Sequence, residues 1–136
     1  METVWDDLPS DERATLDRAA FERHFRPHAE RVIESPENAI FVAETVEGRV
    51  AGYAIVGGAS SMLSQLPFGF LYDVWVAPEF RRQGVARRLV ERAMEWCHTQ
   101  GHTKLKLEAS ARNGAARALY ASLGFVEERV FLGAPL

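Results

Sequence analysis

The chain has 136 residues, of which 47% are hydrophobic and 26% are charged, and its formal net charge is −3. This composition is typical of an ordinary soluble globular protein, and the length predicts one domain over residues 1–136. The longest apolar stretches are too short to span a bilayer, and the first residues lack the basic and apolar regions of a signal peptide. The single Cys97 excludes an internal disulfide and fits a reducing compartment. We therefore expect a cytoplasmic protein with no membrane partner.

Charge is distributed unevenly along the chain. Residues 1–47 contain twelve acidic and five basic side chains, whereas residues 48–136 contain seven acidic and eleven basic ones. A basic second half suits a phosphate-bearing ligand, and an acidic first half suits a cationic one. The pI near 5.8 and the absence of a basic stripe with interleaved aromatic residues argue against nucleic-acid binding.

The first third of the chain predicts two helices. Ser10 is a suitable N-cap, and Asp11 and Glu12 would follow it in the first turn. Pro27 is expected to end this helix, and a short second helix is expected over residues 28–34. Residues 1–9 form either a short edge strand or no strand.

The rest of the chain predicts strands that alternate with helices. A tight turn at Glu47-Gly48 would join the first two strands into a hairpin. Gly57-Gly58 is expected to end the second strand, and residues 59–67 to form a loop. Gly101 and Gly124 would end the two later helices. The predicted elements in chain order are strands 39–46, 49–56 and 68–76, helix 84–99, strand 104–109, helix 112–123, and one or two last strands formed by Phe125 and residues 130–132.

This order predicts a mixed α/β (α+β) fold. Hairpins come first and a β-α-β-α part follows, which favours a mixed, largely antiparallel sheet with helices on both faces. We expect about six strands flanked by about four helices.

The segment Arg81-Arg82-Gln83-Gly84-Val85-Ala86 lies between an apolar strand and an amphipathic helix. The first four N–H groups of a helix have no partner inside it, and they attract an anion. Four arginines, at positions 81, 82, 87 and 88, lie near the start of this helix. Their positive charges are unfavourable there, because the N-terminal end of the helix macrodipole is also positive. They form either a solvated face or, as the glycine turn favours, part of a phosphate site.

Two motifs on either side of one predicted strand resemble those of the GNAT superfamily of N-acetyltransferases. The first is Arg81-x-x-Gly84-x-Ala86, preceded by Val76-Ala77-Pro78. The second is Asn-x-x-Ala-x-x-x-Tyr-x-x-x-Gly-Phe, formed by Asn113, Ala116, Tyr120, Gly124 and Phe125. The resemblance is clear over residues 68–126, and the element order agrees with it from about residue 39. It implies the GNAT-like acyl-CoA N-acyltransferase fold.

The resemblance implies that acetyl-CoA is the co-substrate and that no metal takes part. The backbone N–H groups from Gln83 to Arg88 would hold the pyrophosphate, with Gly84 allowing its close approach. The backbone of Val74 and Val76 would bind the pantetheine arm like an added strand, and a bulge in that strand typically aims an N–H at the thioester carbonyl. The cofactor-binding residues implied in this way are Val74, Trp75, Val76, Arg81, Arg82, Gln83, Gly84, Val85, Ala86, Arg87, Asn113 and Ala116.

Asn113, Ala116 and Tyr120 share one helical face, because they are three and four residues apart. By resemblance, Asn113 contacts the CoA arm and Tyr120 donates a proton to the departing thiolate. A phenol can do so because its ordinary pKa near 10 keeps it protonated at neutral pH. Taken alone, Asn113 would be a helix N-cap and Tyr120 a half-buried core tyrosine.

No glutamate stands in the early part of the central strand, where many GNAT members place their general base. Asp73 is the nearest acid, and strand alternation puts it on the face opposite to Tyr72, Val74 and Val76. It is either a base with a raised pKa or a structural acceptor for a backbone N–H. Glu44, Glu108 and water-mediated deprotonation are the other possibilities.

Weaker signals give no metal site. His24 and His28 are read as surface residues, and the group Cys97, His98 and His102 as a core cysteine beside helix-terminal histidines. Trp75 is read as a packing residue that could also line an acceptor pocket. The apolar loop 59–67 would cap the acceptor site or form a dimer contact.

The leading hypothesis is an enzyme that acetylates a primary amine by direct attack on acetyl-CoA. The acceptor would be a small molecule or a peptide or protein amine, and a homodimer is possible. The alternative is a non-catalytic acyl-CoA-binding or sensing module, which would explain the missing glutamate. A P-loop protein is excluded because the turn lacks the Gly-Lys-Ser/Thr motif.

Overall fold

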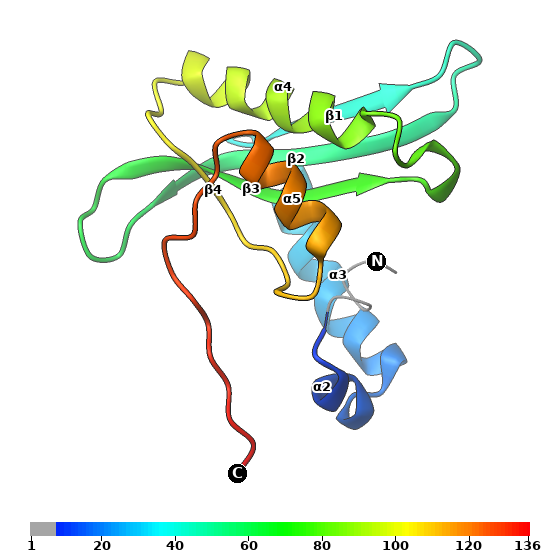
Figure 1. Cartoon of the computed structure of the whole chain (residues 1–136), viewed down its shortest axis with the longest axis vertical. Coiled ribbons are helices and arrows are strands. Elements are labelled where there is room, and N and C mark those ends of the chain that lie inside the picture. Colours follow the sequence, from blue (N-terminus) through cyan, green and yellow to red (C-terminus); the bar gives the residue numbers. More distant parts are fainter. Residues whose placement is uncertain (1–7) are drawn as a thin grey trace.

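The computed structural model describes residues 8–136, which form a four-stranded sheet and four helices (Figure 1). The expected edge strand within residues 1–9 lies almost entirely outside the described residues. In chain order the elements are helices α2 (Ser10–Thr15) and α3 (Arg18–Glu34), strands β1 (Ala39–Glu44), β2 (Val50–Ser60) and β3 (Pro67–Val76), the 3-10 turn η1 (Pro78–Phe80), helix α4 (Val85–Thr99), strand β4 (Leu105–Leu107) and helix α5 (Gly114–Ser122).

The sheet has the order β1-β2-β3-β4. Strands β1, β2 and β3 pair antiparallel, and the short β4 pairs parallel to β3. The prediction of a mixed, largely antiparallel sheet is therefore confirmed. The expected count of six strands is wrong for the described residues, because Phe125 and residues 130–132 form no strand. Residues 130–132 are exposed and gain nothing from burial, whereas Phe125 packs against the core without joining the sheet.

Helix α4 covers one face of the sheet and forms the core with it. Its buried residues recur at helical spacing, so they form a single stripe that faces β2 and β3. The core cluster consists of Ala54 and Val56 from β2, Leu71 from β3, and Leu89, Val90, Ala93 and Cys97 from α4. Residues of β1, β4 and α5 pack around its rim.

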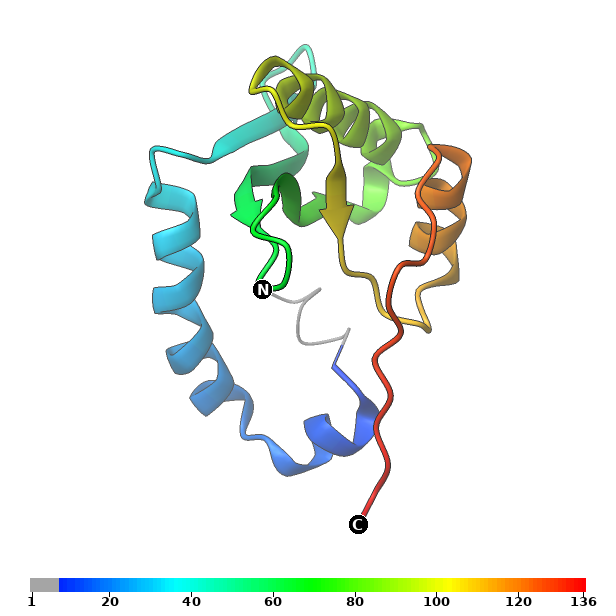
Figure 2. The same ribbon diagram turned by 90° about the vertical axis from the view of Figure 1, so that its left-hand side faces the viewer.

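Helices α2 and α3 lie on the other side of the sheet from α4 (Figures 1 and 2). Figure 2 shows that α3 and the C-terminal segment both leave the sheet on that side. Neither helix contains a buried residue. Helices thus lie on both sides of the sheet as predicted, but of the described helices only α4 contributes buried residues to its core.

The predicted helix boundaries in this region need two corrections. Pro9, not Ser10, is the N-cap of α2, and no side chain caps it. The break between the helices falls before α3, where Asp17 accepts hydrogen bonds from the N–H groups of Ala19 and Ala20. Pro27 lies inside α3 and does not end it. It removes the helical donor to the carbonyl of Arg23, which water can replace because this helix is exposed.

Strand β2 runs through Gly57-Gly58, which were predicted to end it, and the connecting loop is shorter than expected. Gly57 pairs with Phe70, and Gly58 pairs with Gly69. A Cβ on Gly57 would lie 1.7 Å from the Asn38 Oδ1 atom. Glycine is therefore needed here for close packing against the segment before β1, not for a turn.

The other predicted boundaries are confirmed within a few residues. The Glu47-Gly48 turn joins β1 to β2, with Gly48 at φ +82°. Gly101 and Gly124 follow the ends of α4 and α5, both at positive φ. None of the described helices combines the length and the apolarity that crossing a membrane would require.

Candidate acetyl-CoA site

The turn between β3 and α4 presents a row of backbone amides. Gly84, at φ +79°, is the N-cap of α4, and Arg82 before it is at φ +60°. The first hydrogen bond of the helix runs from the Arg88 N–H to the Gly84 carbonyl, at 3.1 Å. Among the described residues, the amides from Gln83 to Arg87 have no acceptor. They form the anion site that the sequence predicts at this helix N-terminus.

The side chains of the turn divide into two groups. Arg81 Nε donates to the Val76 carbonyl at 3.0 Å, and Gln83 Nε2 donates to the Glu79 carbonyl at 3.1 Å. These two side chains hold the turn against the end of β3. The side chains of Arg82 and Arg88 are exposed and make no hydrogen bond or ion pair with the described residues. They are the side chains of the arginine cluster that are available to a polyanion.

Strands β3 and β4 separate beyond Leu71, which leaves part of the β3 edge without a partner strand. Their pairing covers only Gly69, Phe70 and Leu71 of β3. The Ala77 N–H donates to the Ala51 carbonyl of β2, so alternate backbone groups at Val74 and Val76 face away from β2. The Val76 carbonyl already accepts a hydrogen bond from Arg81. The backbone groups that remain without a partner on this edge are the N–H and carbonyl of Val74 and the N–H of Val76. An extended ligand can hydrogen-bond to this edge.

A β-bulge lies next to this open edge. The register passes from Ile55 opposite Asp73 to Val56 opposite Leu71, so Tyr72 is the extra residue of β3. The bulge corrects the prediction that Asp73 and Tyr72 lie on opposite faces. The Tyr72 ring packs on Phe70 at 5.2 Å, while Leu71 and Val74 both point to the α4 face. Because the extra residue resets the alternation, Tyr72 and Asp73 share the face away from α4. Asp73 does lie opposite to Val74 and Val76, as predicted.

Asp73 is a hydrogen-bond acceptor for a tyrosine. The Tyr53 hydroxyl of β2 donates to Asp73 Oδ2 at 2.8 Å, and both residues are partly buried. The Tyr53 ring stacks on Trp75 with 5.7 Å between ring centroids. Burial and, to a lesser extent, the nearby carboxylate raise the pKa of Tyr53 well above its ordinary value, so this hydroxyl stays a donor. Sequence reasoning expected a backbone N–H as the structural donor to Asp73 and missed Tyr53. The sequence of β2 alone carries no signal for this contact, because the contact depends on how β2 pairs with β3.

Helix α5 carries the second motif. The Asn113 side chain accepts from the Ala116 N–H at 3.1 Å, so it is the N-cap of this helix. Its amide nitrogen remains a possible donor to a ligand. Tyr120 is half-buried, and its ring packs edge-on against Phe125 at 5.7 Å, at the rim of the core. Both residues therefore have the structural roles that they would have outside the motif.

The two motifs meet where α4 begins and α5 ends. Arg87 Nη2 donates to Ser122 Oγ at 2.6 Å, and Arg87 also pairs with Glu91 at 3.6 Å. This contact brings the helix turn that carries Tyr120 to the N-terminal end of α4. Asp73 is not part of this group, because its side chain lies on the other face of the sheet.

The described residues contain no group of three histidine, cysteine or acidic side chains that could hold a metal ion. Cys97 is buried in the core, and its burial raises the pKa of the thiol. It is therefore protonated at neutral pH and unsuited to be a nucleophile.

The geometry of the turn and of the open β3 edge fits CoA. A Cβ at Gly84 would have no protein atom within 4 Å, so the space above the amides is free. The amides of Gln83 to Arg87 would hold a pyrophosphate, and the open groups of Val74 and Val76 would bind the amide-containing pantetheine arm.

Comparison with known proteins agrees with this geometry. The sequence matches the acetyltransferase (GNAT) family over residues 1–125. It is 32% identical over 113 residues to an aminoglycoside N(6′)-acetyltransferase type 1 of Serratia marcescens, an alignment that covers 77% of this chain and 75% of that protein. It is 37% identical over 86 residues to the alanine N-acetyltransferase of ribosomal protein bS18 from Salmonella typhimurium, covering 63% of this chain. The chain spans only about half of that second relative, 54% of its length.

Solved structures of acetyltransferases share the fold. The aminoglycoside N-acetyltransferase AAC(6′)-Iy in complex with CoA superposes with a TM-score of 0.66 at 25% identity, covering 89% of this chain and 96% of that one. The apo 6′-N-acetyltransferase AAC(6′)-IG of Acinetobacter haemolyticus gives a TM-score of 0.66 at 22% identity, covering 85% and 82% of the two chains.

Proposed function

This chain belongs to the acetyltransferase (GNAT) family and is an acetyl-CoA-dependent N-acetyltransferase; we propose that it transfers the acetyl group to a primary amine by direct attack. The observation that carries the proposal is the continuity between the free amides of the α4 turn and the open edge of β3. The first suits the pyrophosphate and the second suits the pantetheine arm. Acetyl-CoA supplies the activated acetyl group as a thioester.

We assign the chain's residues as follows. The amides of Gln83 to Arg87 bind the pyrophosphate, and exposed Arg82 supplies further positive charge. The backbone of Val74 and Val76 aligns the pantetheine arm. The bulge at Tyr72 would direct a backbone N–H to the thioester carbonyl, as such bulges typically do in this family. An oxyanion donor of this kind is worth about 3–4 kcal/mol in other enzymes.

The Tyr120 hydroxyl is proposed as the acid that protonates the departing thiolate. The Arg87–Ser122 contact supports this role, because it holds the end of α5 beside the start of α4. For the base, Asp73 is one candidate, although the hydrogen bond from Tyr53 uses one of its oxygens. Water-mediated deprotonation of the amine is the other candidate.

The acceptor is proposed to be an amine on a small molecule or at a peptide end. One similar protein is named for aminoglycoside N(6′)-acetylation and another for acetylation of an alanine in a ribosomal protein, and both reactions modify amines.

The test is the thermal unfolding midpoint of the chain with acetyl-CoA, with ATP as the control polyanion. A ligand at 100 times its Kd adds about 2.7 kcal/mol to the free energy of unfolding, so acetyl-CoA should raise the midpoint by several degrees. ATP should raise it much less, since it lacks the pantetheine arm. Equal shifts with both ligands, or no shift with either, would contradict the proposed site.

A further inference from the structure

Tyr53, Asp73 and Trp75 form a compact group on the face of the sheet away from α4, which we call the aromatic–acid cluster. Tyr53 and Trp75 are direct cross-strand partners, and their rings stack at 5.7 Å with an interplanar angle of 29°. The Asp73 carboxylate accepts the Tyr53 hydroxyl at 2.8 Å. All three side chains are partly buried, so each also keeps accessible surface.

The Asp73 carboxylate has no cationic partner among the described residues. Strands β1, β2 and β3 contain no lysine or arginine, and their acidic residues are Glu44 and Asp73. Lys106 of β4, which lies over Phe68 at 4.8 Å on this face, pairs with Glu128 at 2.9 Å and not with Asp73. Charged groups that are partly withdrawn from water are usually paired, so Asp73 is an exception in this structure.

The surroundings of Asp73 are apolar and aromatic. Ile40 and Val42 of β1 are exposed on the same face, with Val42 opposite Tyr53 in the register. A carboxylate beside two aromatic rings attracts an ammonium ion, because charge attraction and cation–π contacts act together. A rim of aliphatic side chains would accommodate the carbon skeleton that carries such an ion.

We propose that the aromatic–acid cluster binds a second, non-reacting ammonium group of the acceptor. The acceptors would then be amines with two or more protonated nitrogens, such as diamines, polyamines and amino sugars, and not monoamines. This inference rests on the proposed function, since the bulge at Tyr72, next to Asp73 in the chain, places the cluster beside the proposed acetyl position. The acidic first third of the chain would add a diffuse attraction for such acceptors.

The test compares 1,4-diaminobutane with n-butylamine, which differ by one ammonium group, through the ratio of their kcat/KM values. We expect the chain to favour the diamine by about ten- to hundredfold, the range for one charged hydrogen-bonded contact. Asp73→Asn should reduce this ratio to near one, and Tyr53→Phe should reduce it partly. Glu47→Gln is the matched control, because Glu47 is an exposed carboxylate in the turn between β1 and β2, and it should leave the ratio unchanged.

The outcomes separate anchoring from proton transfer. If Asp73→Asn lowers kcat/KM equally for both amines, or abolishes both activities, Asp73 acts as a base and the anchoring proposal is overturned. Calorimetric binding of 1,4-diaminobutane to the CoA-saturated chain provides a readout that does not need turnover. Binding that is lost in Asp73→Asn supports the cluster even if neither amine is acetylated, a result that would count against the proposed function alone. Equal affinity of 1,4-diaminobutane for the unmodified chain and for Asp73→Asn would overturn the proposal.

Discussion

Two residues with positive φ form the turn before α4. They differ in the conformational free energy that a positive φ costs, because only one of them has a side chain. Gly84, at φ +79°, accepts this conformation without a steric penalty, whereas Arg82, at φ +60°, has adopted it despite its side chain. A non-glycine residue in this region is strained, and strained residues often accompany function. Here the strain accompanies a turn that leaves a row of amides free.

Gly84→Ala should therefore destabilise the chain by about 1–2 kcal/mol through backbone conformation alone. No protein atom lies within 4 Å of the added Cβ, so no clash contributes. Acetyl-CoA binding should weaken as well, because the Cβ would occupy the space above the amides. Gly114→Ala is the control, since Gly114 begins α5 with equally free surroundings and without a positive φ. Thermal unfolding with and without acetyl-CoA measures both effects, and an unchanged midpoint in Gly84→Ala would contradict the account.

The Tyr120 hydroxyl can be tested separately from the Tyr120 ring. Tyr120→Phe keeps the ring that packs on Phe125, so the fold and acetyl-CoA binding should persist. Removal of a general acid should lower kcat by about 10²–10⁴-fold. Steady-state kinetics measures this loss, and acetyl-CoA binding to the variant serves as the internal control. Unchanged turnover would assign Tyr120 a packing role only.

At the scale of elements, α4 contacts the sheet closely because β2 and β3 carry glycines beneath it. A Cβ on Gly69 of β3 would lie 2.3 Å from the Cys97 Sγ atom of α4, which is closer than real atoms approach. A Cβ on Gly52 of β2 would lie 3.3 Å from the Leu89 Cδ1 atom of α4, a tight contact. These glycines therefore allow the close spacing between the two layers.

Gly69→Ala should destabilise the chain by about 1–3 kcal/mol, the usual cost of overpacking a core. The added methyl group displaces the Cys97 sulfur, which is buried and cannot turn into solvent. Cys97→Ala removes that sulfur, so the double variant should lose less stability than the two single variants together predict. Chemical denaturation of all four chains measures the coupling. Additive losses would show that the two side chains do not compete for the same space.

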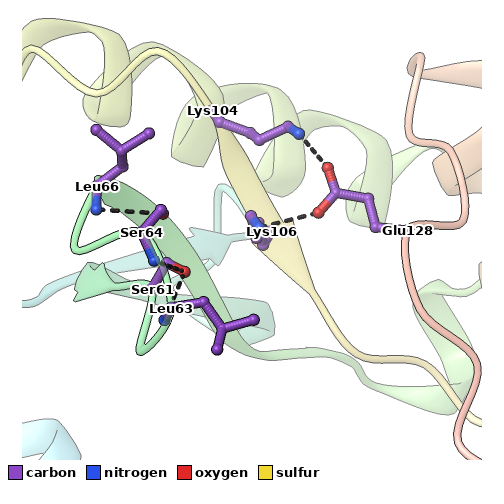
Figure 3. A network of polar contacts seen from close by, with 7 residues as sticks. All are labelled: Ser61, Leu63, Ser64, Leu66, Lys104, Lys106 and Glu128. Atoms are coloured by element: carbon purple, nitrogen blue, oxygen red, sulfur yellow. Dashed lines mark hydrogen bonds and ion pairs between the residues drawn. The ribbon is translucent and has the colours of Figure 1, made fainter.

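At the scale of the whole molecule, the C-terminal segment is attached to β4 by charge. Glu128 forms ion pairs with both Lys104 and Lys106, which are two residues apart (Figure 3). The two lysines lower the pKa of Glu128 from 4.5 to about 2. Val126, Val130 and Phe131 on the same segment are exposed, so apolar burial contributes little to the attachment.

This attachment should be pH-dependent with a defined sign. Because the pKa of Glu128 is lower in the folded chain, its contribution is fully present above the ordinary value of 4.5 and is lost as the pH falls towards about 2. Cleavage within residues 126–132 by an acid-stable protease should therefore accelerate over this range, and added salt should also accelerate it. At pH 7, Glu128→Gln should be cleaved there faster than the unmodified chain, while Glu95→Gln on α4 should not. Cleavage of the unmodified segment that is independent of acid and salt would contradict the attachment.

Several elements could be predicted because their signals are local in the sequence. Gly84 after an arginine-rich turn, the apolar stripe of α4, and the Asn113–Tyr120 spacing all lie within single segments, and the structure has the corresponding elements there. The glycine-ended helices and the β1–β2 hairpin were predictable for the same reason.

Features that depend on contacts between distant segments could not be predicted from the sequence. Gly57 and Gly58 look like strand breakers in sequence, yet they continue β2 because Asn38 and the neighbouring strand pack against them. The bulge at Tyr72 changes which side chains share a face, and it follows from pairing with β2 and not from β3 alone. The continuous pairing of β2 with β3, with Tyr53 opposite Trp75, places Asp73 beside Tyr53, 20 residues away in the chain. Local propensity is a property of one segment, whereas register and close packing are properties of two segments in contact. The aromatic–acid cluster therefore forms only when strands β2 and β3 pair.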